Sequence, residues 1–117
     1  MRAYSFAIFL LISAAGANAG PLEDASSAYN KGEFNIAEQL YRVLAAQGDR
    51  VAQFQLGLMY DEGHGVPRKY HEAVQWLVVA AAQNDQESSY YLGRIYQDGR
   101  GGPQNYAIAR RWYRIAA

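Results

Sequence analysis

Side chains that commonly carry out chemistry are few in this sequence, and their spacing matches no catalytic or metal-site pattern. The chain has 117 residues, no cysteine and two histidines, His64 and His71. Neither histidine lies at metal-ligand spacing from a carboxylate on one helical face. Nucleophilic chemistry would then depend on serine, but no serine lies in a Gly-x-Ser-x-Gly or Ser-x-x-Lys motif. The sequence therefore predicts no catalytic residue, no metal site and no cofactor; the serines considered are Ser26, Ser27, Ser88 and Ser89.

Two glycine-rich segments, 63–67 and 99–103, have a composition that can bind phosphate. Phosphate-binding loops follow a strand and end in Gly-Lys-Ser or Gly-Lys-Thr, and neither segment has these features. Both fit the ends of helices better, because glycine takes the left-handed conformation after a helix and a proline soon afterwards prevents its continuation. We interpret both segments as turns between helices. We expect Asp61 and Glu62, just before the first turn, to be solvated.

A repeat of 36 residues organises these segments. A shift of 36 places residues 52–81 on residues 88–117, and eleven of the thirty pairs are identical. A period in this range is typical of stacked repeat architectures. The identities include Leu56/Leu92, Gly57/Gly93, Tyr60/Tyr96, Pro67/Pro103, Tyr70/Tyr106 and Trp76/Trp112.

Each repeat is predicted to contain two helices that share a core. Apolar residues recur every three or four positions, which places them on one helical face. A third, degenerate unit comes first, because Ala37, Leu40 and Tyr41 lie 36 residues before Ala73, Trp76 and Leu77. Three hairpins are about the minimum for a stable stack. The predicted helices are 22–31, 34–47, 50–62, 70–83, 86–98 and 106–117.

The first nineteen residues are predicted to be a cleavable signal peptide. Arg2 is followed by an apolar run from Tyr4 to Ala14, and Ala17-Asn18-Ala19 fits an A-x-A cleavage pattern. The apolar run is shorter than the about 20 residues that a membrane-spanning helix needs. We therefore expect cleavage near Ala19-Gly20, a periplasmic or secreted location, and no membrane contact after cleavage.

The spaced positions of residues 50–85 and 86–117 resemble the Sel-one-like repeat, a relative of the tetratricopeptide repeat. The pattern includes Leu56-Gly57, Gly63-x-Gly65 and Trp76 in the first copy, and residues 20–49 resemble a degenerate tetratricopeptide-like hairpin. The resemblance implies an all-α fold, a right-handed superhelix (α-solenoid) of helix-turn-helix repeats. It also implies an adaptor or scaffold that binds a protein or a peptide.

Two departures from the family pattern bear on function and on local stability. A cysteine-rich branch has been linked to penicillin binding and hydrolysis, so the alternative function is a cell-wall or β-lactam-hydrolysing enzyme, although this chain has no cysteine. The family commonly has aspartate before the tyrosine that starts the second helix, where this chain has Lys69 and Asn105. Asparagine can cap a helix but lysine cannot.

The first helix of each repeat is predicted to line the concave surface of the stack. Phe54 and Leu58 lie nearly opposite the core residues of their helix, and Tyr90 and Arg94 are their equivalents 36 residues later. These four residues are predicted to form an aromatic and basic groove for a partner. The alternative is that Phe54 and Tyr90 pack between adjacent first helices.

A second candidate surface lies on the second helix of the middle repeat. Val74 and Val78 occupy positions held by Glu38 and Arg42 in the first unit. These charged equivalents indicate a water-facing site, so the valines are predicted to form an exposed apolar patch for a partner. Burial of the valines after a small shift in packing is the alternative.

Charge is balanced overall but differs between the two ends of the chain. The formal net charge is zero, which gives no reason to expect nucleic acid as a partner. Residues 23–62 carry seven acidic and three basic side chains, whereas residues 94–114 carry five arginines and one aspartate. Weak head-to-tail self-association is therefore a further expectation.

Overall fold

The computed structural model describes residues 20–117, and these fold into six α-helices with no strand. The expected signal peptide, residues 1–19, lies outside the described residues. The predicted all-α solenoid of helix-turn-helix repeats is confirmed. The helices are α2 (Pro21–Asn30), α3 (Phe34–Ala46), α4 (Arg50–Glu62), α5 (Tyr70–Ala81), α6 (Gln86–Asp98) and α7 (Tyr106–Ala116).

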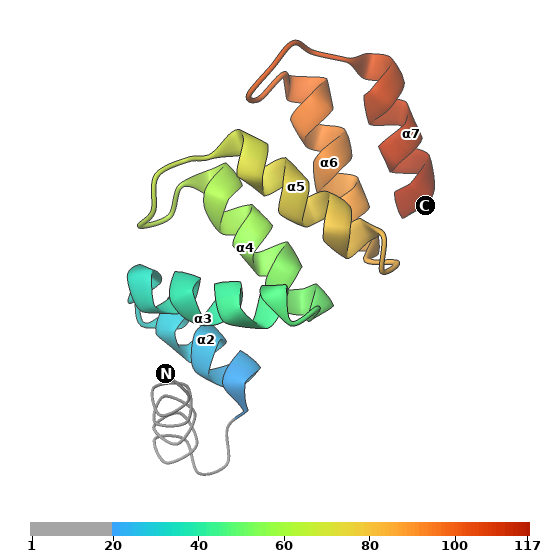
Figure 1. Cartoon of the computed structure of the whole chain (residues 1–117). Coiled ribbons are helices and arrows are strands. Elements are labelled where there is room, and N and C mark those ends of the chain that lie inside the picture. Colours follow the sequence, from blue (N-terminus) through green and yellow to red (C-terminus); the bar gives the residue numbers. More distant parts are fainter. Residues whose placement is uncertain (1–19) are drawn as a thin grey trace.

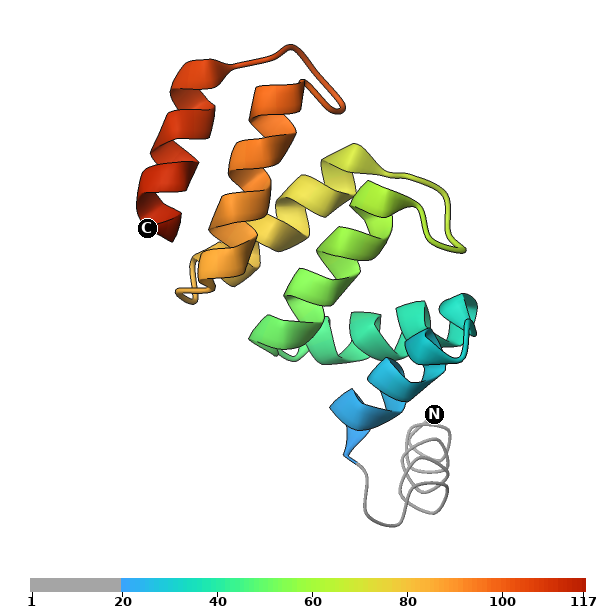
Figure 2. The ribbon, with the colours of Figure 1, turned by 180° about the vertical axis from the view of Figure 1, so that it is seen from behind.

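The hairpins follow one another along a stack. Each helix packs mainly against the helices before and after it in the chain. Figures 1 and 2 show the α2–α3 hairpin at one end, the α4–α5 hairpin in the middle and the α6–α7 hairpin at the other end. The principal extents are 48 × 27 × 26 Å. No helix of residues 20–117 is long and apolar enough to span a bilayer.

The first helices of the two complete repeats begin and end in the same way. The Asp49 carboxylate accepts a hydrogen bond of 2.9 Å from the Ala52 amide, and Asp85 accepts one of 2.9 Å from the Ser88 amide. An N-terminal cap of this kind satisfies an amide that has no partner within the helix. At the other end Gly63 and Gly99 take the left-handed conformation, with φ of 71° and 70°. The interpretation of the glycine-rich segments as turns is confirmed.

The second helices differ in their caps, as the sequence predicts. The Asn105 side chain accepts a hydrogen bond of 3.0 Å from the Ile108 amide. Lys69 occupies the equivalent position before α5 and makes no cap with its side chain. Predicted and observed helix ends agree within two residues. The largest difference is at α5, which ends at Ala81 because a turn with Asn84 at φ 66° follows it.

The core lies between the helices as two adjoining clusters. The first joins α2, α3, α4 and the start of α5, with Tyr41, Leu56 and Tyr60 buried and Trp76 packed against them. The second joins the middle and last repeats through Leu77 and Leu92, with Trp112 packed against them. Alanines on the same faces are buried, so neighbouring helices can approach closely while the large side chains fill the space between them.

Candidate interaction surface

The loop inside each complete repeat packs on the repeat before it. A Cβ atom added to Gly65 would lie 2.3 Å from the Phe34 ring, and one added to Gly101 would lie 2.5 Å from the Tyr70 Cβ. Both glycines have positive φ, 69° and 72°. Because 36 residues separate the two glycines and also the two aromatic residues, the same contact occurs at both junctions. These loops therefore hold successive hairpins in one orientation.

The residue between the two glycines of each loop also reaches the preceding unit. In the first loop this residue is His64, whose Nδ1 forms a hydrogen bond of 2.8 Å with the Tyr29 hydroxyl. The His64 ring also lies near the Phe34 ring, with centroids 6.2 Å apart. His64 is therefore packed locally against the preceding unit.

In the second loop the equivalent residue is Arg100, which forms an ion pair with Asp61 of the middle repeat. Arg100 Nε and Nη2 donate hydrogen bonds of 2.9 and 3.0 Å to the two Asp61 oxygens, and Nη1 donates one of 2.7 Å to Asp98. Asp61 is 7% exposed, so the expectation that it is solvated is wrong. Packing of the last loop over α4 buries this carboxylate, and the sequence gives no signal that pairs residues 39 positions apart.

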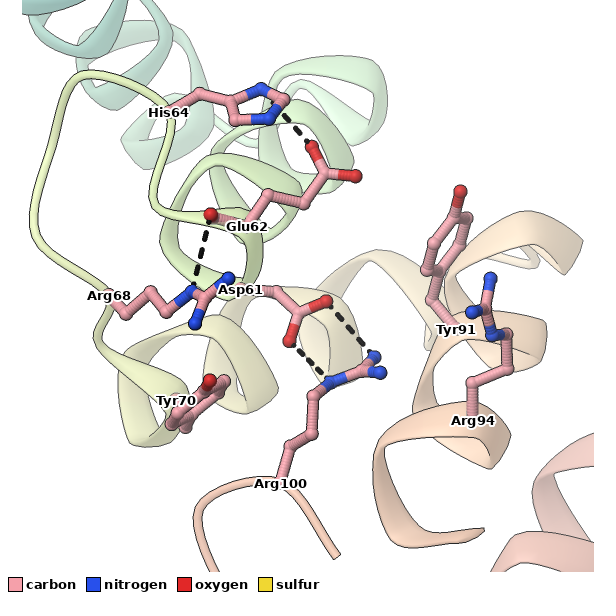
Figure 3. A pocket seen from close by; sticks show the side chains of 8 residues that line it. All are labelled: Asp61, Glu62, His64, Arg68, Tyr70, Tyr91, Arg94 and Arg100. Carbon is pink, nitrogen blue, oxygen red and sulfur yellow. Dashed lines mark hydrogen bonds and ion pairs between the residues drawn. The ribbon is translucent and has the colours of Figure 1, made fainter. Parts of the chain in front are cut away.

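A polar hollow of about 380 Å³ opens between α4 and α6, above this ion pair. Figure 3 shows the Asp61–Arg100 pair at its base, with Arg68 and Tyr70 on one side and Tyr91 and Arg94 on the other. Glu62 and His64 complete the lining, and their side chains approach to 3.5 Å. The hollow thus collects side chains from α4, α6 and the start of α5, and from both glycine-rich loops.

The structure separates the four residues predicted for the concave groove. Phe54 is 7% exposed and packs edge-on against Tyr91, with ring centroids 5.7 Å apart. Leu58 is half-buried against the second core cluster. Tyr90, the equivalent of Phe54, is 48% exposed and contacts Tyr113 of α7. Arg94 is exposed and lines the hollow, so Arg94 and Tyr90 are the members open to a partner.

The two valines predicted for the outer patch also differ. Val78 is 39% exposed and is followed by exposed Val79, whereas Val74 is half-buried against the second core cluster. Val74 lines a small hollow of about 180 Å³ together with Tyr96 and Pro103. An exposed apolar site therefore exists, with Val78 and Val79 as its open members.

Glu38 and Arg42, the charged equivalents of these valines, form hydrogen bonds with Tyr60. The Tyr60 hydroxyl donates a hydrogen bond of 2.6 Å to Glu38, and Arg42 donates to both Tyr60 and Glu38. The Glu38 side chain is 20% exposed, so its position is not simply water-facing, whereas the Arg42 side chain is 47% exposed, as expected. The position lies at the junction between α3 and α4, where a buried tyrosine needs a polar partner.

Both acidic groups of this junction have perturbed proton affinities. Burial of the phenol and the hydrogen bond to Glu38 raise the pKa of Tyr60 well above its usual value. The hydrogen bond from Tyr60, followed by the contacts with Arg42, holds the pKa of Glu38 below its ordinary value. The shifts are those of a structural contact between repeats, because the hydrogen bonds that cause them join α3 to α4.

The described residues contain no group of three His, Asp or Glu side chains placed to hold a metal ion. His71 is exposed at the start of α5, and His64 is held by Tyr29. The two histidines therefore have separate surroundings.

Three stacked hairpins with exposed basic and aromatic residues on the first helices define the class of this protein. It is an α-solenoid of the kind that presents an extended surface for protein–protein interaction.

The chain belongs to the Sel1 repeat family, whose profile matches residues 50–85 and again residues 86–117. No curated protein sequence matches the chain. One similar solved structure is a Sel1 repeat protein from Oxalobacter formigenes, with 43% identity over 70% of this chain and a TM-score of 0.64. Another is a protective antigen with the SLR fold, present in uropathogenic Escherichia coli strains, with 38% identity over 68% of this chain and a TM-score of 0.65. This chain covers 34% of the first protein and 17% of the second, so it spans a minor part of either.

Proposed function

We propose that this chain is an exported adaptor that holds a peptide or a protein surface on the face formed by α4 and α6. The observation that carries the proposal is the hollow between these helices, which the exposed Arg94 lines. Tyrosine and arginine are the residue types most often found at the centre of protein interfaces. Membership of the Sel1 repeat family supports the same reading at the level of an interaction module.

Affinity capture from an extract of the bacterial envelope tests this proposal. The double variant Leu58→Ser/Arg94→Glu is expected to lose capture of the partner that the unchanged protein retains. Arg111→Glu is the matched control, because Arg111 is exposed on α7 and does not line the hollow. Thermal unfolding of each variant separates lost binding from lost folding.

Three results would contradict the proposal as stated. Retention of the partner by the folded double variant would show that the partner does not bind on α4 and α6. Loss of capture in Val78→Glu alone would move the interface to the outer patch instead. Hydrolysis of nitrocefin above the blank rate would favour the alternative of a β-lactam-hydrolysing enzyme.

Export is the second element of the proposal. Arg2, the apolar run from Tyr4 to Ala14 and the small residues before Gly20 support a cleavable signal peptide. The proposed cut falls next to the start of α2 at Pro21. The Gly20 amide donates a hydrogen bond of 3.0 Å to Glu23. Cleavage would turn this amide into an ammonium group beside the same carboxylate, which strengthens the contact.

The size of the protein recovered from the cell envelope tests export. Mass spectrometry is expected to find a chain that begins at Gly20. A cell-associated protein that still begins at Met1 would contradict cleavage at this position.

A further inference from the structure

Two arginines on opposite sides of the hollow have no carboxylate partner in residues 20–117. Arg68 follows α4, and its Nε donates a single hydrogen bond of 3.3 Å to the Glu62 carbonyl oxygen. Arg94 lies on α6, and its guanidinium stands 5.8 Å from the centroid of the Tyr91 ring. Both arginines are exposed, and both line the hollow (Figure 3). Their remaining N–H groups are therefore available to a ligand.

The acidic residues of the hollow are already engaged with other groups. Asp61 accepts two hydrogen bonds from Arg100, which also pairs with Asp98. The Glu62 carboxylate lies 3.5 Å from His64 Nδ1 and is directed toward that ring in Figure 3. These carboxylates are thus directed toward Arg100 and toward His64, and neither forms an ion pair with Arg68 or Arg94 in residues 20–117. The guanidiniums of Arg68 and Arg94 therefore keep N–H groups that an anionic group from outside can reach.

The shape and surroundings of the hollow favour an acidic peptide segment over a small anion. A volume of about 380 Å³ can hold several side chains. Tyr70 and Tyr91 add aromatic walls to the hollow. A guanidinium can donate two parallel hydrogen bonds to one carboxylate, so two guanidiniums suit neighbouring acidic side chains.

We propose that the hollow between α4 and α6 binds an acidic peptide segment, whose side-chain carboxylates are held by Arg68 and Arg94. The inference rests on the proposed interaction function and names the partner chemistry of its surface. Arg94 is one of the residues that the sequence predicted for the groove. Arg68 joins it because the α4–α5 loop folds back beside the C-terminal end of α4, where its side chain donates to Glu62.

Titration of the ¹⁵N-labelled protein with capped tetraglutamate tests the inference, with capped tetraglutamine as the neutral probe. Tetraglutamate is expected to shift the amide signals of Arg68, Tyr91 and Arg94, and tetraglutamine is not. Arg68→Glu and Arg94→Glu are each expected to weaken binding about tenfold, because each removes a charge-assisted contact. Arg111→Glu, which changes another exposed arginine on α7, is expected to leave binding unchanged.

Three outcomes would overturn the inference. The first is no shift at about 10 mM tetraglutamate, a concentration at which even weak contacts are visible. The second is that both peptides cause equal shifts, or that the folded Arg68→Glu and Arg94→Glu variants bind tetraglutamate as tightly as the unchanged protein does. The third is a stronger effect of a thymidylate tetranucleotide on the same signals, which would assign the hollow to phosphate.

Failure of this inference and failure of the proposed function give different results. If Leu58→Ser/Arg94→Glu abolishes capture of a protein partner while tetraglutamate does not bind, the interaction surface is supported and its preference for acidic peptides is contradicted. If tetraglutamate binds as expected but the same variant does not affect capture, the hollow is supported as a peptide site and the adaptor function on this face is contradicted.

Discussion

Arg100 forms two hydrogen bonds, of 2.9 and 3.0 Å, with the carboxylate of Asp61 in the preceding repeat. The equivalent residue one repeat earlier, His64, forms a hydrogen bond of 2.8 Å with Tyr29 in its own preceding unit. The residue between the two loop glycines thus ties each repeat to the one before it. At the second junction this contact is an ion pair, which forms the base of the hollow.

Removal of the Arg100 side chain should destabilise the protein more than removal of the Asp98 side chain, the second carboxylate that Arg100 contacts. Arg100→Ala leaves the buried Asp61 carboxylate without a counter-charge, and we expect a loss of about 3 kcal/mol in the free energy of unfolding. Asp98→Ala removes an exposed contact and should cost less than about 1 kcal/mol. Urea unfolding measures both. Equal losses would mean that the Asp61 contact is no stronger than a surface pair.

A methyl group at Gly101 should disturb the junction between the last two repeats. Gly101 has φ of 72°, and an added Cβ would lie 2.5 Å from the Tyr70 Cβ. We expect Gly101→Ala to cost more than about 1 kcal/mol, from the backbone conformation and from displacement of Tyr70. Gly102→Ala is the control, since a Cβ there meets nothing within 4 Å, and it should change stability by less than about 0.5 kcal/mol. Thermal unfolding decides between close packing and a loose loop.

Exchange of the capping residues should shift stability in opposite directions. Lys69 and Asn105 have similar backbone angles, with φ of −138° and −144°, but Asn105 alone caps its helix with its side chain. Lys69→Asn is expected to gain and Asn105→Ala to lose about 1 kcal/mol. Chemical denaturation measures both changes. A Lys69→Asn protein less stable than the parent would mean that the contacts of Lys69 with Glu72 and Tyr60 outweigh a cap.

Loss of the Tyr60 hydroxyl should change the acid titration of Glu38. The hydrogen bond from Tyr60 is the main cause that holds the pKa of Glu38 below its ordinary 4.5, so Tyr60→Phe should raise that pKa. A lowered folded-state pKa adds stability above the ordinary pKa, and this stability is lost as the pH falls through the folded-state value. The variant should therefore lose less stability on acidification than the parent.

NMR titration of the Glu38 side-chain carboxyl measures this change directly. Tyr96→Phe is the matched control, because Val74 and Val78 replace the charged partners at the equivalent junction. An unchanged Glu38 titration in Tyr60→Phe would show that Arg42 alone controls the carboxyl group.

Self-association is expected at low salt and not at high salt. Glu23 and Glu33 are exposed on the first hairpin, and Arg110 and Arg114 are exposed on the last, at opposite ends of the stack (Figure 1). Attraction between exposed charges is screened within about 8 Å at physiological ionic strength. Light scattering should detect the association, and Arg110→Glu/Arg114→Glu should abolish it. A monomer at every salt concentration would contradict the expectation.

The solved relatives place these tests in context. This chain corresponds to a minor part of each, and their own functions do not define what it binds. The experiments above therefore use residues of this chain alone.

Helix positions and their caps could be predicted from the sequence because they depend on local order. The repeat of 36 and the spacing of apolar residues placed all six helices within two residues of their ends. Side-chain chemistry also distinguished Asn105 from Lys69 as a cap. Each of these features involves residues a few positions apart, where helical geometry fixes the distances.

Contacts between repeats were decided only by the tertiary structure. Phe54 and Tyr90 are equivalent in sequence, yet Phe54 is buried against the next first helix and Tyr90 is largely exposed. Asp61 was expected in water and is buried beneath Arg100. The angle between successive hairpins determines which side chains meet, and the helical period alone does not specify that angle. The sequence by itself thus determined the repeating units, and their stacking decided which residues form the hollow that we propose as the binding surface.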